Sequence, residues 1–148
     1  EYKKMALFQY MIGNSDWSLR QVRNIKIMLL NGKNVVIPYD FDFSGLVEAP
    51  YAMVSPDHGE RSIRDRTFLG FNPKEVRLDR ANRVLIKRRR KLNRITWRLK
   101  KLPKTERRNI KRYLDSFYEG IDFIYVKRKK KSRQQNPTDN KDQQENHR

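Results

Sequence analysis

The sequence predicts an α+β fold, in which a small β-hairpin carries a polar site and packed helices follow it. Three observations predict this class. Apolar residues recur at helical spacing near the start, an Asn-Gly pair separates two short apolar runs, and leucines recur every seven residues in the second half. The chain has 148 residues, a length at which one domain is expected.

The first predicted elements are a helix and a hairpin. Apolar side chains of residues 2–12 share one helical face, and Gly13 follows where a glycine often ends a helix. Residues 25–30 are expected to form a strand and residues 35–39 its return strand. The Asn31-Gly32 pair between them favours a tight turn, because both residue types tolerate a positive φ at little cost.

The rest of the chain predicts a loop and then helices. Residues 40–73 contain many prolines and glycines and no long periodic run, which indicates a long ordered loop. The leucine repeat predicts a long helix at roughly 74–101. Pro103 stops that helix and can begin the next one, which we expect to end at Gly120. Residues 121–126 are short and apolar, and they fit either a strand or a helix.

The charge of the chain is unevenly distributed. There are 35 Lys and Arg against 17 Asp and Glu, a net charge of +18. Residues 1–70 hold nine basic and eight acidic side chains, whereas residues 71–148 hold 26 basic and nine acidic ones. Residues 127–148 contain no hydrophobic side chain, so we expect a disordered basic and polar tail.

Composition excludes several classes of protein. The absence of cysteine excludes a disulfide scaffold and a thiol nucleophile, and two histidines make a histidine-based metal site a poor expectation. No apolar run approaches the roughly 20 residues of a membrane span. The chain starts at Glu1 rather than Met, and we interpret it as a fragment. A targeting segment could precede it, so the localisation stays open.

The most informative stretch places four polar side chains around the hairpin. Asp16 and Asn24 precede it, and Asp40 and Asp42 follow it. Because a hairpin returns its end to its start, these oxygen-bearing side chains are expected to converge at one end of the hairpin. Carboxylates and a carboxamide are hard ligands that suit Mg²⁺ or Mn²⁺. Alternatively, the same residues form turns and a structural polar network.

This order of residues is the one that phosphoryl transfer needs. In the kinase template an Asp receives the hydroxyl proton, a downstream Asn holds one metal, and a later Asp holds the metals that bridge the phosphates. With Asn14-Ser15-Asp16-Trp17, Asn24-Ile25-Lys26 and Pro38-Tyr39-Asp40-Phe41-Asp42, the chain resembles atypical kinases of the spore-coat kinase (CotH) family and, more distantly, HipA-type kinases.

The resemblance implies a fold, a set of roles and partners. Residues 1–126 would be the carboxy-terminal lobe of a kinase-like fold. Its parts would be a catalytic-type segment at 2–45, a loop at 46–73 and a basic helical part at 74–126. Asp16 would be the catalytic residue, and Asn24, Asp40 and Asp42 would be metal ligands. The implied cofactors are Mg²⁺ or Mn²⁺ with ATP, and the implied substrate is a protein hydroxyl.

The chain departs from the kinase template in two respects. The interval from Asp16 to Asn24 is three residues longer than in the kinase catalytic loop. The Gly-rich loop and phosphate-binding lysine of an amino-terminal lobe are absent from this chain. Whether the chain is an enzyme therefore stays open, and a pseudokinase-like scaffold is an alternative to a phosphotransferase.

Two further sets of basic residues are candidates for binding. Arg64 and Arg66 suit a phosphorylated substrate, or they pair with nearby acids. A second alternative function is a non-catalytic helical module that binds nucleic acid or an anionic surface. Its polyanion contacts would come from one helical run, which otherwise is a solvated face: Lys87, Arg88, Arg89, Arg90 and Lys91.

Overall fold

A computed structural model describes residues 1–54, 58–70 and 79–134 of the chain. Within these ranges it contains a two-stranded antiparallel sheet and three helices, which confirms the predicted α+β class. The elements, in chain order, are α1 (Tyr2–Ile12), β1 (Ile25–Leu30), β2 (Lys33–Pro38), α2 (Asp79–Arg98) and α3 (Lys104–Gln134).

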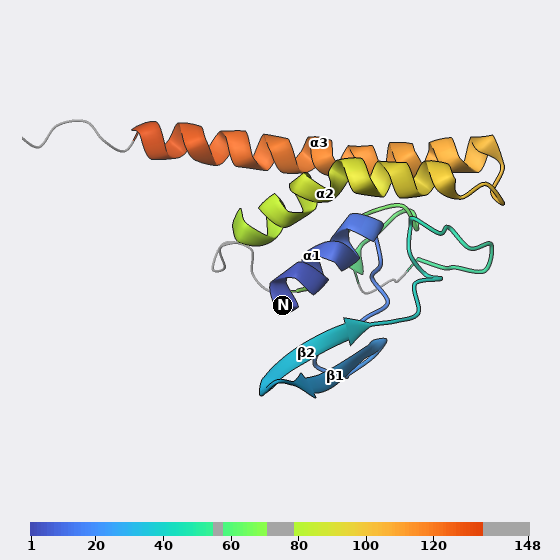
Figure 1. Cartoon of the computed structure of the whole chain (residues 1–148), viewed down its shortest axis with the longest axis horizontal. Helices are drawn as coiled ribbons and strands as arrows, with labels where there is room; N and C mark the ends of the chain where they lie inside the picture. The colour runs from blue at the N-terminus through green and yellow to red at the C-terminus, as the bar shows by residue number, and fades with distance from the viewer. Residues whose placement is uncertain (55–57, 71–78, 135–148) are drawn as a thin grey trace, which may run out of the picture.

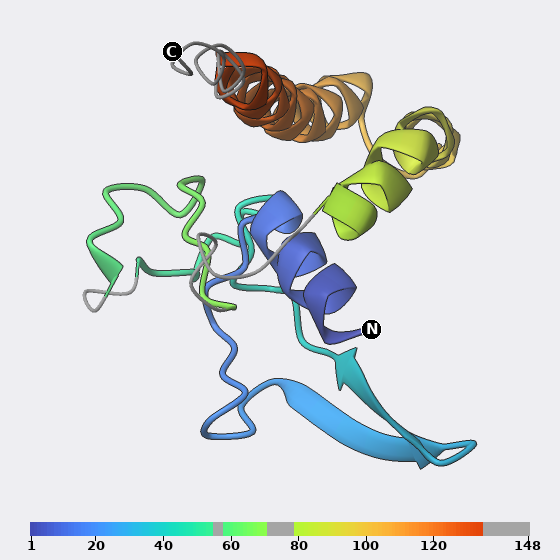
Figure 2. The same cartoon turned by 90° about the vertical axis from the view of Figure 1, so that its left-hand side faces the viewer.

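Helix α1 lies between the hairpin and the pair formed by α2 and α3 (Figures 1 and 2). Its apolar face supplies the centre of the core, because residues of α2 and α3 pack against it from the other side. The hairpin projects away from this core on the opposite side of α1 (Figure 2). The buried members of the main cluster are Leu7, Met11, Ile12, Ala81, Leu114, Phe117 and Tyr118.

The first helix and the hairpin follow the sequence closely. Gly13 ends α1 in the left-handed conformation, with φ of 63°, and its amide N–H donates to carbonyls of the last turn. In the hairpin, Ile25 pairs with Pro38 and Leu30 pairs with Lys33. The turn at Asn31 and Gly32 has positive φ at both residues, as the Asn-Gly pair predicts.

The later helices differ from the prediction at their ends. Helix α2 ends at Arg98, and its expected start at 74–78 lies outside the described residues. Helix α3 continues through Gly120 to Gln134, so Gly120 does not end it and residues 121–126 are helical. Residues 127–134, which we expected in a disordered tail, are helical as well, and residues 135–148 lie outside the described residues.

The long loop is ordered where it is described, because it is bonded to the end of α1. The amide of Gly45 donates to the carbonyl of Gly13, and that of Leu46 to Ile12, both at 3.0 Å. A Cβ at Gly45 would lie 2.6 Å from the carbonyl oxygen of Ile63, so this approach requires glycine. Among the described helices, none has a stretch long and apolar enough to cross a bilayer.

Candidate functional site at the base of the hairpin

The carboxylate of Asp16 is held from two sides. The side-chain amide of Asn24 donates to Asp16 Oδ2 and to the Asp16 carbonyl, each at 2.8 Å. The Nε of Arg23 lies 3.4 Å from Asp16 Oδ1. Asn14, which is buried, accepts the backbone N–H of Asp16 at 2.9 Å, and this bond fixes the loop that presents the carboxylate.

The hairpin brings the second group of acids back to the first. The amide of Tyr39, just after β2, donates to the carbonyl of Asn24, just before β1, at 3.1 Å. Asn24 and Asp40 both have positive φ, 51° and 58°. Asparagine and aspartate adopt this left-handed conformation more readily than other residues with a Cβ, and here it turns the chain at both ends of the hairpin.

The carboxyl groups of Asp40 and Asp42 form a close pair. A hydrogen bond to Asp42 and the negative charge of Asp42 raise the pKa of Asp40, and the charge of Asp16 contributes in the same direction. The same hydrogen bond from Asp40 lowers the pKa of Asp42. The pair therefore retains a proton at a higher pH than an isolated aspartate would.

Two further donors hold Asp42. The phenol of Tyr51 donates to Asp42 Oδ2 at 3.1 Å, and the amide of Phe43 donates to Asp42 Oδ1 at 3.0 Å. Both bonds favour the charged form of Asp42 and help to lower its pKa. Conversely, the carboxylate raises the pKa of the Tyr51 phenol. Asp42 is thus the fixed and ionised member of the pair.

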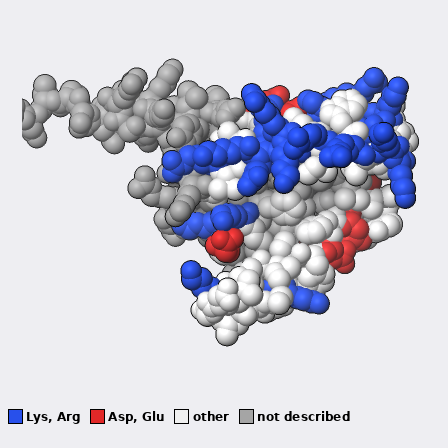
Figure 3. Space-filling view, viewed as in Figure 1, with Lys and Arg blue, Asp and Glu red and all other residues white. Residues whose placement is uncertain are grey.

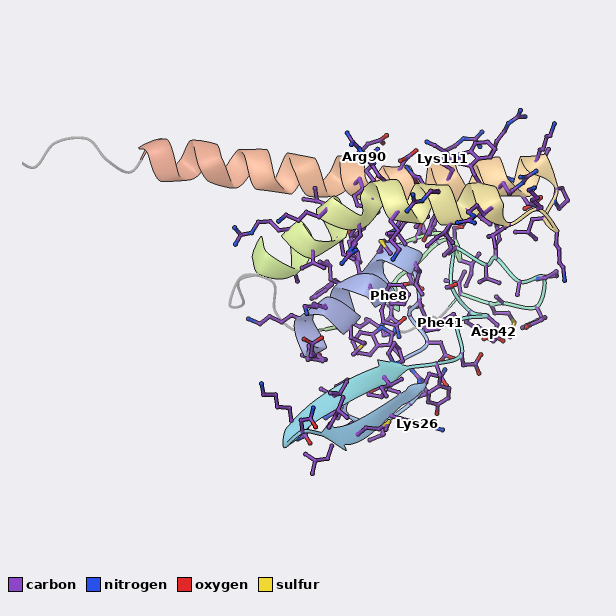
Figure 4. The ribbon with its side chains drawn as sticks, viewed as in Figure 1. Phe8, Lys26, Phe41, Asp42, Arg90 and Lys111 are labelled. Atoms are coloured by element: carbon purple, nitrogen blue, oxygen red, sulfur yellow. The ribbon has the colours of Figure 1, made fainter. Side chains whose placement is uncertain are left out.

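The segment between these acids is anchored in the core. Phe41 packs edge to face on Phe8 of α1, with ring centroids 5.8 Å apart, and lies beside it while Asp42 lies farther along the loop (Figure 4). Ser44, which is fully buried, bridges to Asn14 in antiparallel fashion. The loop with Asp16 and the loop with Asp40 are therefore joined directly as well as through the hairpin.

The predicted residues form two contacting pairs at the base of the hairpin, Asn24 with Asp16 and Asp40 with Asp42, and the charge of Asp16 acts on Asp40. Two features differ from the prediction. The amide nitrogen of Asn24 is used to hold Asp16, so only its oxygen is left for a metal. Within residues 1–54, 58–70 and 79–134, no three acidic or histidine side chains form a group that could hold a metal ion. The available donors are the Asp40–Asp42 carboxyl pair and the amide oxygen, and Mg²⁺ commonly binds one or two carboxylates together with substrate phosphates.

Arg66 is a structural residue here. Its guanidinium donates to the carbonyls of Met11 and Tyr113 at 3.1 and 2.5 Å and to Ser116 Oγ at 3.0 Å. It also stacks on the Tyr113 ring at 3.8 Å, and burial lowers its pKa. All three nitrogens bond within the fold, and the phosphate contact of Arg66 stays a prediction. Arg64 pairs with Glu48, the alternative we left open for these arginines.

The basic run on α2 has two kinds of member. Arg89 points to α3 and pairs with Asp115 at 2.9 Å, and Lys111 contacts the other oxygen of the same carboxylate. Arg89 is therefore engaged within the fold, and its side chain keeps 39% of its surface exposed. The other four residues of the run are exposed: Lys87, Arg88, Arg90 and Lys91.

Sequence reasoning missed two residues of the site, Arg23 and Tyr51. Arg23 precedes Asn24 and could have been suspected from that position alone, because neighbours of a turn residue often share its contacts. Tyr51 lies nine residues after Asp42 in an irregular loop, and no pattern in the sequence signals its contact.

Comparisons with known proteins add no relative. No known protein family, curated protein or solved structure matches the chain.

Proposed function

We propose that the chain carries the acceptor-binding and metal-binding half of a kinase-like phosphotransferase that acts on a protein hydroxyl. One observation supports this proposal above the others. The Asp16 carboxylate is held by Asn24, and its negative charge contributes to the raised pKa of Asp40 in the Asp40–Asp42 pair. A base and a metal-binding pair of carboxylates close together are what phosphoryl transfer requires of a protein.

Each residue has a distinct task in this proposal. Asp16, oriented by Asn24 and Arg23, accepts the hydrogen bond of the attacking hydroxyl and takes its proton. Asp40 and Asp42, with the amide oxygen of Asn24, hold Mg²⁺ or Mn²⁺. Bound there, the metal supplies positive charge that stabilises the transferred phosphoryl group. The Asp40 proton leaves when the pair becomes a ligand.

Titration calorimetry with Mn²⁺, with and without ATP, tests the metal site. We expect Mn²⁺ binding to weaken at least about tenfold in Asp40→Asn and in Asp42→Asn, as for loss of a ligand. Asp16→Asn keeps the binding, because Asp16 is not a ligand in this scheme. Glu119→Gln on α3 removes a remote carboxylate and serves as the control. Unchanged binding in both ligand variants would reject the site.

Transfer of the γ-phosphate from ATP to a protein hydroxyl, measured in a chain that also contains an amino-terminal nucleotide-binding lobe, tests the reaction itself. We expect Asp16→Asn to lose roughly 100-fold or more of the rate, the usual share of a general base. Mn²⁺ binding by the carboxyl pair with no transfer would instead favour a pseudokinase-like scaffold.

A further inference from the structure

The exposed side of α2 carries a stripe of positive charge that the proposed reaction does not use. Lys87, Arg90, Arg94 and Arg98 follow one another at intervals of three or four residues, which places them on one helical face. All four are exposed, as is Lys91 beside them. From Lys87 to Arg98 the stripe is roughly 16 Å long at the rise of an α-helix.

Few acidic residues accompany this stripe along α2 and the first half of α3. Residues 81–120 contain 15 Lys and Arg but only three Asp and Glu. One of the three, Asp115, faces Arg89 on the side of α2 that packs against α3, and hydrogen bonds from Lys111 and Arg89 outweigh its partial burial and lower its pKa. That carboxylate is therefore already neutralised by two cations that are not part of the stripe.

Helix α3 extends the positive surface. Lys104, Arg108 and Arg112 are exposed on its first turns. In Figure 3 the basic side chains form a band over α2 and α3, whereas the hairpin below is mostly uncharged. Arg90 of α2 and Lys111 of α3 lie along this same upper side of the molecule in Figure 4.

We propose that this surface of α2 and α3 binds the phosphate backbone of a nucleic acid. A row of cations along a rigid helix matches a linear polyanion, whose phosphates repeat at a regular spacing. A helix that lies in a lipid surface turns an apolar face to the acyl chains. In α2 the face with Ala81, Leu85 and Leu92 packs into the core instead. The exposed apolar side chains of α2 lie on two opposite sides of the helix and form no single face that could enter a bilayer: Val84 and Ile95 on one side, Ile86 and Trp97 on the other. The surface thus offers a row of charges without a continuous apolar face, which favours nucleic acid over an anionic membrane.

Fluorescence anisotropy with a labelled oligo(dT) of about 20 nucleotides tests the proposal, at salt concentrations from about 50 to 200 mM. The test variant is Lys87→Gln/Arg90→Gln/Arg94→Gln. The control, Lys3→Gln/Arg20→Gln/Lys33→Gln, removes the same charge from exposed positions away from α2 and α3. The basic tail is present in both, so its contribution is equal.

We expect the test variant to bind at least about tenfold more weakly. The slope of log K against log salt concentration should also become less steep by about 2, because each of the three lost cations contributes roughly 0.7. The control should stay close to the unmodified chain. Equal losses in both variants would overturn the proposal. Stripe-dependent binding to phosphatidylserine vesicles without binding to the oligonucleotide would overturn it as well.

Four further experiments keep the result interpretable. Circular dichroism melting checks that the test variant folds, and Lys91→Gln/Arg98→Gln provides a second substitution of the same stripe.

Asp40→Asn should leave oligonucleotide binding unchanged, and a loss equal to that of the test variant would contradict a surface independent of the acidic site. Oligo(U) in place of oligo(dT) tells RNA from DNA, and binding of either through the stripe supports the proposal.

Discussion

At the scale of single residues, the Asp40–Asp42 pair has a direct consequence for pH dependence. The pKa of Asp40 is raised by its hydrogen bond to Asp42 and by the charge of Asp42. The stability that comes from the proton on Asp40 is therefore complete below the ordinary carboxyl pKa. It is lost as the pH rises through the raised value, because two like charges then face each other.

Replacing Asp42 by Asn should lower the pKa of Asp40 towards its ordinary value, because both main causes of the shift disappear. Carbon-13 NMR titration of the aspartate carboxyl carbons measures this directly. The Glu119→Gln chain, altered far from the pair, should titrate at Asp40 as the unmodified chain does. An Asp40 pKa that does not move in Asp42→Asn would mean that the two carboxyl groups do not interact in solution.

At the scale of elements, Arg66 connects the end of α1 to the middle of α3. Its guanidinium bonds two backbone carbonyls, one from each helix, and lies on the Tyr113 ring. Tyr113 in turn donates its phenol proton to the carbonyl of Arg64 at 3.1 Å. These polar contacts help to fix the position of the loop on α3.

Arg66→Ala should reduce the free energy of unfolding by about 3 kcal/mol, because it leaves buried carbonyls without their charged donor. Arg61→Ala, at an exposed arginine of the same loop, should change it by no more than about 0.5 kcal/mol. Urea denaturation followed by circular dichroism compares the two chains. Equal midpoints would show that Arg66 is not a structural residue.

The sequence predicts the elements well where a local signal decides them. Gly13 ends α1 because of its left-handed backbone, and Asn31-Gly32 fixes the hairpin register. The predicted helix end at Gly120 was wrong, because a glycine within a helix costs only about 1 kcal/mol, which flanking helix formers can offset. Residues 127–134 were expected to be disordered because they have no apolar side chain. They are helical because lysine and arginine are good helix formers.

At the scale of the whole molecule, the convergence of the site was predictable and its details were not. A hairpin must return Asp40 to the neighbourhood of Asn24, so topology alone brings these residues together. The contacts of Tyr51 and Arg66 depend on how an irregular loop folds over α1, and no periodicity encodes that path. The same limit applies to Arg89, whose pairing depends on the packing of α2 against α3.

The hairpin leaves much apolar surface uncovered within the described structure. Ile27, Met28, Leu29 and Leu30 are between 50 and 73% exposed. Apolar patches of this kind promote association. We expect Leu29→Lys to reduce concentration-dependent self-association with a stability change within about 0.5 kcal/mol, since this side chain is the most exposed of the four.

Sedimentation velocity over a range of protein concentrations measures this change. The Arg20→Lys chain, which keeps the charge and alters no apolar surface, is the control. Self-association that is the same in Leu29→Lys and in the control would show that the hairpin is not the associating surface.

The packing of α1 against α3 also sets a delay during synthesis. Tyr118, at one end of this contact, donates its phenol proton to the sulfur of Met11, 107 residues earlier in the chain. At roughly 5–20 residues per second, a ribosome needs about 5–20 s to make the intervening segment. During that interval the apolar face of α1 has no partner from α3, so a newly made chain closes this part of its core only after α3 has been made.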